Sequence, residues 1–529
     1  MPSSPTEVSR EETSGSPSGG KPGGGLAINT LYNFLGRLLP MGAALFCIPL
    51  IVEGLGVEKF GVLTLAWMIV GYFGIFDLGV GRSTTRFVAK AIEDNRTAEI
   101  PGLVWTALGM LLLFGLIGGG LFAVLSPWLV RSVFNVSPEL HLDTIHAFWC
   151  LAASIPFILG ASGGRGVLEG YQKFGLANLI RVPASLFNFV APVVVLLVWK
   201  SLFAVVLALS LGRAVVLFIY LIAALRCFGG LSRSWKASRT VARRLLGFGG
   251  WLTATNIFGA AMSFGYVDRF IVSSKIDMSA VAYYSTPFEV IAKYLIFSGA
   301  LVTTLFPMFS AMSSGRSSES AALQNSMIRY LLALMSGLIF ATITFAEPGL
   351  RLWLGEEFAT NSTLVAQLLA VGILMISLGS ITSSAIQGAG RPDLTAKRHM
   401  IQLPLYMAAC WLASIEFGLV GVAAVWVIYA VTDFIVIQLL SYRITVTPNS
   451  RFLSEQMRLL AFSATVVGSA FAVATIESMA TRIAIAAGAL AVILLIGWRF
   501  LLNSDDRARL RSARSRFLSS AGSANGEAA

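Results

Sequence analysis

The sequence predicts an all-α integral membrane protein, because it is apolar, poor in charge and organised in long apolar runs. Its mean hydropathy is +0.76, and 56% of its 529 residues are hydrophobic. Only 12% are charged, whereas charged residues make up about a quarter of a typical soluble domain. Each apolar run extends over about twenty residues or more, the length of a helix that crosses the hydrocarbon core of a bilayer. These observations exclude a soluble globular protein.

The apolar runs divide the chain into about fourteen predicted transmembrane helices. The expected organisation is a disordered cytoplasmic tail at 1–25, an N-lobe of six helices at 26–226, a basic cytoplasmic linker at 227–245, a C-lobe of six helices at 246–443, helices 13 and 14 at 444–503, and a cytoplasmic tail at 504–529. The predicted spans lie near 27–52, 59–82, 100–126, 143–165, 176–199, 202–226, 246–274, 280–312, 326–347, 362–388, 395–416, 418–443, 455–477 and 483–503.

The distribution of Lys and Arg predicts that both termini and the linker are cytoplasmic. With the N-terminus placed inside, 29 of the 39 basic residues fall on the inner side and 6 fall on the outer side. Cytoplasmic loops of membrane proteins carry such an excess of positive charge. An even number of spans, with both ends on one side, is consistent with this count.

A weak internal repeat relates the two predicted lobes at a shift of 218 to 221 residues. Phe60-Gly61-Val62-Leu63 matches Val281-Ala282-Tyr283-Tyr284, and Leu168-Glu169-Gly170 matches Ile386-Gln387-Gly388. Six helices per repeat is an even number, so the two repeats run in the same direction through the membrane. The sequence therefore predicts two parallel six-helix bundles related by an axis along the membrane normal, with two extra helices at the C-terminal side.

Short motifs in both halves match a known family. They are Gly54 to Leu63, Asp77-Leu78-Gly79 and Thr85 to Val88 in the first half, and Tyr266 to Val272, Ala282-Tyr283-Tyr284, Leu305-Phe306-Pro307 and Gly388 to Pro392 in the second. In these motifs the sequence resembles the polysaccharide transporter family, whose best-known members are the Wzx-type O-antigen flippases. This family belongs to the multidrug/oligosaccharidyl-lipid/polysaccharide exporter superfamily.

The resemblance implies a fold, a function and partners. The fold is a V of two six-helix lobes that alternates between inward-open and outward-open states. The function is that of a flippase, which exports polyprenyl-diphosphate-linked oligosaccharide units across the bacterial inner membrane for surface polysaccharide biosynthesis. The implied partners are this substrate and the membrane lipids, with a polysaccharide polymerase and glycosyltransferases as candidate protein partners.

Basic residues inside the predicted spans mark the candidate substrate site. A charge at the centre of a membrane helix costs about 2.5 to 3.5 kcal/mol on insertion scales, so it needs a partner or a wet cavity. We expect Arg37, Arg213 and Lys293 to bind the substrate in a cavity between the lobes, because fixed cations can replace the water around a diphosphate. The alternative is that these cations pair with carboxylates and only hold helices together.

Five other charged residues are candidates for gating or ion coupling: Glu289, Asp433, Asp77, Asp268 and Arg269. Glu289 and Lys293 are four residues apart on one helix face, which also suits a structural pair. Arg213 and Asp433 occupy corresponding positions in the two halves and either oppose each other as a gate or are satisfied within their own lobes. The other three lie near helix ends, where stabilising a helix terminus is the alternative role.

The sequence contains no motif for bond-breaking chemistry or for a cofactor. There is no Walker A sequence, the four cysteines are scattered without paired spacing, and the three histidines do not form a ligand set. No nucleophile with a base and no paired carboxylates stand out. We therefore expect no catalytic residue, no metal site and no cofactor. The basic residues line membrane borders, so a nucleic-acid partner is not expected either.

The sequence leaves two alternative functions open. A cation-coupled multidrug antiporter of the same superfamily would favour an acidic binding pocket, and the eight charged residues within the spans are evenly divided between the two signs. A membrane glycan ligase or glycosyltransferase would carry a long soluble loop, whereas the longest predicted outside loops, near 127–142 and 348–361, have about a dozen residues. The family resemblance, more than the charge, favours the flippase.

Overall fold

A computed structural model of the chain describes most of the sequence. The described residues are 22–75, 77, 79–227, 230–231, 238–247, 266–312, 317–445, 450–503 and 506–507, and the helical residues 22–38, 317–318, 444–445 and 450–453 are described for their backbone only. The predicted tails therefore lie almost wholly outside the described residues. The helix α1 already begins at Pro22, three residues before the predicted end of the N-terminal tail at residue 25.

The described part of the chain is helical and contains no strand. Its helices are α1 (Pro22–Leu55), α2 (Val57–Ile75), α3 (Val80–Glu93), α4 (Ile100–Trp128), α5 (His141–Gly170), α6 (Phe174–Leu196), α7 (Leu202–Cys227), α9 (Tyr266–Lys275), α10 (Met278–Ile291), α11 (Leu295–Met312), α12 (Ser317–Leu354), α13 (Glu356–Gly388), α14 (Pro392–Glu416), α15 (Gly418–Thr445), α16 (Ser450–Ala474) and α17 (Met479–Ile496). Eleven helical stretches among these residues are long and apolar enough to cross a membrane, which confirms the predicted fold class.

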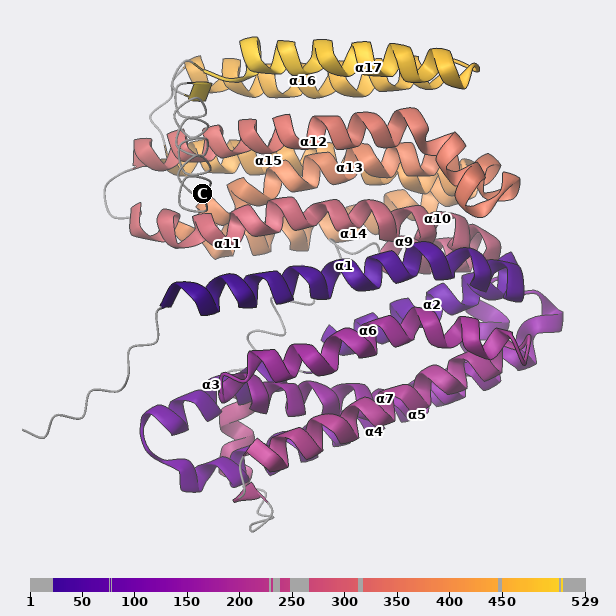
Figure 1. The fold of residues 1–529 in the computed structure, drawn as a ribbon, viewed down its shortest axis with the longest axis vertical. Coiled ribbons are helices and arrows are strands. Elements are labelled where there is room, and N and C mark those ends of the chain that lie inside the picture. Colours follow the sequence, from indigo (N-terminus) through magenta and orange to yellow (C-terminus); the bar gives the residue numbers. More distant parts are fainter. Residues whose placement is uncertain are drawn as a thin grey trace, which may run out of the picture.

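The helices form two lobes, with α1–α7 in one and α9–α17 in the other (Figure 1). The same helix contacts recur in both lobes: α5 packs against α3, α4 and α7, and α13 packs against α11, α12 and α15. The pair α6 and α7 is likewise matched by α14 and α15. The helices α16 and α17 pack on α12, and no helix among the described residues of the first lobe corresponds to them.

Two glycines mark equivalent close approaches in the two lobes. Gly170 ends α5, and a Cβ there would lie 2.9 Å from Val88 of α3. Gly388 ends α13, and a Cβ there would lie 2.6 Å from Phe309 of α11. The glycines are 218 residues apart and their neighbours are 221 apart, so the shift found in the sequence relates both members of each contact.

The second predicted span differs from expectation because it is two helices. The sequence predicts one span at 59–82, but α2 ends at Ile75 and α3 continues from Val80 to Glu93. Asp77 bridges the break by accepting a hydrogen bond from the backbone N–H of Gly79 at 2.9 Å. The helix α3 was expected to be a basic loop; it is helical because its apolar residues recur on one face, which packs on α5.

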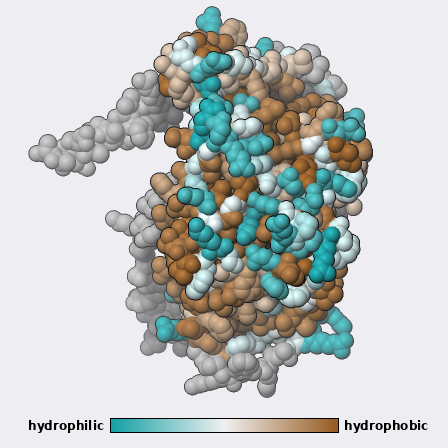
Figure 2. Space-filling model, turned by 90° about the vertical axis from the view of Figure 1, so that its right-hand side faces the viewer, coloured by the Kyte–Doolittle hydropathy of each residue, from teal (hydrophilic) through white to brown (hydrophobic). Residues whose placement is uncertain are grey.

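The lobes contact each other at one end of the molecule, which we call the contact end. There α2 crosses α10 so closely that a Cβ on Gly61 would lie 1.8 Å from the carbonyl oxygen of Met278. Nearby, the Asn135 N–H donates to the carbonyl of Ser273 at 2.7 Å. Figure 2 views this end and shows hydrophilic side chains gathered over it among hydrophobic ones.

The opposite end carries the link between the lobes, and we call it the linker end. Residues 239–247 are helical and pack on the first lobe, where Ser83 Oγ donates to the carbonyl of Leu245 at 3.3 Å and Arg244 lies 5.9 Å from the ring centre of Phe87. The predicted boundary between linker and C-lobe at 245 therefore falls inside a helix. Most of the predicted seventh span, residues 248–265, lies outside the described residues, and its end forms α9 in the second lobe.

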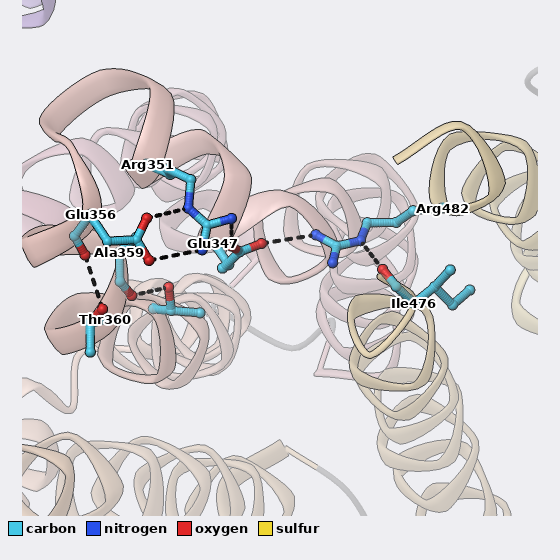
Figure 3. A network of polar contacts seen from close by, with 8 residues as sticks. Glu347, Arg351, Glu356, Ala359, Thr360, Ile476 and Arg482 are labelled. Carbon is cyan, nitrogen blue, oxygen red and sulfur yellow. Dashed lines mark hydrogen bonds and ion pairs between the residues drawn. The ribbon is translucent and has the colours of Figure 1, made fainter. Parts of the chain in front are cut away.

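Polar contacts fix the pair α16 and α17 to α12 at both ends. At the contact end, Arg482 of α17 binds Glu347 of α12 at 3.3 Å and the carbonyl of Ile476 at 2.7 Å, and Glu347 also binds Arg351 (Figure 3). At the linker end, Asp506 binds Arg329 of α12 at 2.7 Å. Because these ion pairs and hydrogen bonds hold both ends of the pair to α12, α16 and α17 are part of the second lobe.

Candidate functional site

A cluster of three charged residues lies on α9, on α10 and on the 3₁₀ turn Ala292–Tyr294 that follows α10 in the second lobe. Glu289 lies between two cations: its Oε1 binds Arg269 at 2.8 Å and its Oε2 lies 3.5 Å from Lys293 Nζ. Arg269 is buried and rests 5.2 Å from the ring centre of Phe288. Glu289 and Lys293 have about half of their side-chain surface exposed, at 48% and 51%. The cluster carries a net charge of +1 and presents an ammonium group that its partner carboxylate does not cover.

The cluster lies well inside the bundle along α10. Lys293 is 15 residues beyond Met278, which corresponds to about 22 Å from the contact end at 1.5 Å per residue. Because α10 is the helix that crosses α2 of the other lobe, it belongs to the elements that separate or approach when the lobes move. A half-exposed charged pair at this depth is a candidate binding site for an anion.

Asp268 forms a second polar centre, directly beside Arg269 in the chain but directed to the interior of the lobe. Its carboxylate is fully buried and accepts hydrogen bonds from the hydroxyl groups of Tyr284 on α10, at 2.6 Å, and Tyr406 on α14. The thiol of Cys410 is 4.0 Å away. The carboxylate is therefore surrounded by neutral donors, while the neighbouring guanidinium is bound to Glu289.

Asp433 is paired inside the same lobe. Its carboxylate lies 3.1 Å from Arg398 Nε of α14, and both side chains are buried. Arg398 was counted in the sequence as a basic residue of the inner loop, but it lies two turns into α14. Arg213 donates to Ser154 Oγ at 2.8 Å in the first lobe. The structure therefore places Arg213 and Asp433 in separate contacts within their own lobes and does not bring them together as a gate.

The two remaining predicted site residues, Asp77 and Arg37, lie outside the second lobe. Asp77 lies at the break between α2 and α3, where it also accepts a bond from Ser162 Oγ at 3.4 Å, so its contacts are those of a residue that stabilises a helix terminus. Arg37 lies in α1, but its side chain is outside the described residues. Among the described residues no group of three His, Cys, Asp or Glu side chains has the arrangement of a metal site.

Sequence reasoning missed the tyrosines that surround Asp268 and the arginine that pairs with Asp433. A signal for them is present in the sequence of α14, where polar residues recur every three or four positions in an otherwise apolar helix. They are Thr395, Arg398, Gln402, Tyr406, Cys410 and Ser414. Such a stripe predicts a polar face, and in the structure this face is directed into the lobe, since all but Gln402 are buried.

Comparison with known proteins identifies the family. A family model described as polysaccharide biosynthesis protein matches residues 26–313. A Shigella flexneri protein named as an O-antigen transporter is 30% identical over 417 residues, which cover 78% of this chain and 97% of that protein. The chain belongs to the polysaccharide biosynthesis protein family.

Two solved structures share the fold of this polysaccharide biosynthesis protein. The lipid II flippase MurJ in an inward closed conformation superposes with a TM-score of 0.67 at 14% identity, over 89% of this chain and 98% of that one. A multidrug resistance transporter of the MATE family, in its inward-facing conformation, gives 0.60 at 17% identity, over 82% and 95%. At these identities the likeness shows the fold alone, which consists of two lobes of helices.

Proposed function

We propose that this chain is a flippase that carries polyprenyl-diphosphate-linked oligosaccharides across the bacterial inner membrane by alternating access. The observation that carries the proposal is the 30% identity to the Shigella flexneri O-antigen transporter over 97% of that protein's length. The two-lobe fold and the charged cluster on α10 fit this role. The MATE neighbour shares the fold alone, and none of the described contacts in the second lobe favours drug export specifically.

The distribution of basic residues indicates which end of the protein faces the cytoplasm. The linker end carries the loops with the excess of Lys and Arg, so we assign it and both termini to the cytoplasm. The contact end then faces the periplasm, and the crossing of α2 and α10 at Gly61 closes that side. In this assignment the structure represents the state in which the lobes are joined on the periplasmic side.

In this proposal the substrate site consists of the cations that the sequence predicts within the membrane spans. Lys293 and the Arg269–Glu289 pair supply one net positive charge at mid-depth, and Arg37 and Arg213 extend the site into the first lobe. A lipid diphosphate carries about two negative charges, which such cations can neutralise while the head group is out of water. The oligosaccharide passes with the diphosphate, and no covalent bond is made or broken.

The proposal is tested in a host strain that lacks the gene. We expect loss of the surface polysaccharide and accumulation of the lipid-linked unit in the cytoplasmic leaflet, restored by the parental chain. Arg37→Ala should restore less export than Arg37→Lys, because lysine keeps the charge. Normal polysaccharide with altered drug sensitivity would favour the antiporter, and accumulation of exported but unjoined units would favour a glycan ligase.

Two partners follow from the proposed role. Glycosyltransferases make the substrate on the cytoplasmic side, and a polysaccharide polymerase uses it on the periplasmic side. Co-purification of either enzyme with the full chain from membranes would identify a direct contact.

A further inference from the structure

The second lobe carries a small polar pocket at the linker end, which we call the linker-end pocket. It lies where α12, α16 and the turn Gly497–Leu501 after α17 meet. The helices α16 and α17 form the layer of this lobe that is farthest from the first lobe (Figure 1). The residues that line the pocket include Asn325, Arg329, Glu455, Arg458, Leu501 and Asn503. The pocket is therefore separate from the charged cluster around Glu289.

The carboxylates around this pocket are already bound by other groups. Asp506 accepts hydrogen bonds from Arg329 Nε at 2.7 Å and from the Tyr330 hydroxyl at 2.9 Å. Glu455 accepts a hydrogen bond from Asn325 Nδ2 at 2.6 Å. These contacts fix the chain that follows α17 to α12, and they occupy both carboxylates.

Three arginines at this end are not balanced by a carboxylate among the described residues. Arg458 lies in the wall of the pocket and Arg499 lies on the turn after α17, and both are exposed. Neither makes a hydrogen bond or an ion pair within the described part of the chain. Arg507 follows Asp506, and its Nε lies 3.5 Å from the carbonyl of Asn503. The linker-end pocket therefore offers positive charge to an external anion.

Large apolar side chains lie beside these arginines. Trp498 and Phe500, on either side of Arg499 in the chain, are 39% and 66% exposed, and Met457, next to Arg458, is 60% exposed. Tryptophan side chains gather at the border between hydrocarbon and water, so the neighbouring arginines lie at the depth of lipid phosphate groups. Positive charge beside an exposed apolar surface suits an anion that carries acyl chains.

We propose that the linker-end pocket binds the phosphate group of an anionic phospholipid, with Arg458 and Arg499 as its contacts and Trp498 and Phe500 beside the acyl chains. Basic pockets between helices on the cytoplasmic side of a membrane suit such head groups, and a guanidinium group can donate two hydrogen bonds to one phosphate. The linker end is the end that we assign to the cytoplasm. Because the pocket lies away from the candidate substrate site, it would be present in a flippase and in a drug antiporter alike.

The sequence that follows the pocket is also basic. Arg509, Arg511, Arg514 and Arg516 come after Arg507. A run of this kind next to a membrane helix is attracted to anionic lipids by charge alone and requires no pocket. A test of the proposal must therefore separate the pocket from the run.

A lipid in the pocket would stabilise the attachment of the chain end to α12. Asn503 lines the pocket, and its N–H donates to the Asp506 carboxylate at 3.2 Å. The Arg507 N–H donates to the carbonyl of Asn503 at 3.0 Å. A ligand that binds only the folded arrangement stabilises it by mass action. Bound lipid should therefore slow the local opening that exposes these two amide hydrogens.

Native mass spectrometry of the purified full chain in detergent measures lipid binding at both ends of the protein. We expect dioleoyl phosphatidylglycerol to bind about tenfold more tightly than dioleoyl phosphatidylcholine, and Arg458→Ala and Arg499→Ala each to weaken its binding about fivefold. Arg131→Ala is the matched control, because Arg131 is also exposed on a π-helical turn but lies at the contact end. Equal affinities in the parental chain and in all three variants would overturn the proposal, and so would an equal loss in all three.

Two further arms identify the ligand and its site. Glycerol 3-phosphate has the same phosphate group without acyl chains, and we expect it not to displace phosphatidylglycerol; displacement at similar concentrations would show a soluble anion to be the ligand. A chain with Arg509, Arg511, Arg514 and Arg516 changed to Gln should retain most of its affinity for phosphatidylglycerol. Complete loss in that chain would locate the binding in the basic run and overturn the pocket.

Hydrogen exchange is an independent measurement of the site. Phosphatidylglycerol should slow exchange of the Asn503 and Arg507 amide hydrogens in the parental chain but not in Arg458→Ala, and phosphatidylcholine should slow it in neither. Exchange that is unchanged while the lipid binds would show that the lipid lies elsewhere. No glycan is present in these experiments, so phosphatidylglycerol binding by a chain that exports no glycan would refute the flippase function and retain the lipid site.

Discussion

Gly61 allows the lobes to close at the contact end, so adding one methyl group there is expected to open it. A Cβ at this position would lie 1.8 Å from the carbonyl oxygen of Met278, and non-bonded Cβ contacts are essentially never below 3.0 Å. The crossing of α2 and α10 would have to widen by about 1.2 Å or more. Overpacking of this kind costs about 1–3 kcal/mol, which corresponds to a shift of about 5- to 150-fold in the equilibrium between the closed and opened states.

The shift can be measured as a distance between spin labels on the two lobes. Cysteines replacing Glu139 and Leu352, in a chain without its four native cysteines, would report the separation at the contact end. We expect Gly61→Ala to populate longer distances than the parental chain. Gly74→Ala is the matched control, because it lies on the same helix and its Cβ would meet nothing within 4 Å. Equal distance distributions in the two variants would refute the reasoning.

Three further perturbations have defined outcomes. Lys293→Ala should lower glycan export by about tenfold while Lys293→Arg retains most of it, and parental export by the alanine variant would exclude an anion site at this residue. Arg482→Ala should lower the free energy of unfolding by about 1–3 kcal/mol, since it breaks charged hydrogen bonds at a side chain only 8% exposed. Arg351→Ala, at a residue 54% exposed, should lower it by less than about 1 kcal/mol. Similar losses in the two variants would show that Arg482 does not fix α17 to α12. Burial acts to raise the pKa of Asp506, but the charge of Arg329 and hydrogen bonds outweigh it and hold this pKa below its ordinary value. The resulting stabilisation is present above the unfolded pKa and is lost as the pH falls through the folded one. The protection of the Asn503 and Arg507 amide hydrogens, relative to their intrinsic exchange rates, should therefore fall below about pH 4 in the parental chain but not in Asp506→Asn.

The fold could be predicted from the sequence because bilayer thickness fixes the length of apolar helices. The repeat was visible in short matches such as those around Gly170 and Gly388, since both glycines are required by the close packing of two helices. The break at Asp77 was not predicted, because hydropathy continues through it and the interruption depends on a local hydrogen bond.

The candidate site could be predicted only in part. Inspection of isolated charges in the sequence found Lys293 and Glu289, which contact each other because they are four residues apart in the chain. It missed the partners of Asp268 and Asp433, because Tyr406 and Arg398 are brought to them by the packing of α14 against α9 and α15. Arg398 also lies near a loop rich in basic residues, so its burial depends on which face of α14 is turned inward.

Direct observation of flipping tests the central claim. The purified full chain would be reconstituted in vesicles with a fluorescent polyprenyl-diphosphate oligosaccharide, and the exposed fraction would be measured with a membrane-impermeant glycosidase. The account predicts that nearly all of the lipid becomes accessible with the parental chain, and about half with empty vesicles or with a chain that carries both Arg37→Ala and Lys293→Ala. Accessibility equal to that of empty vesicles with the correctly folded parental chain would contradict the flippase assignment.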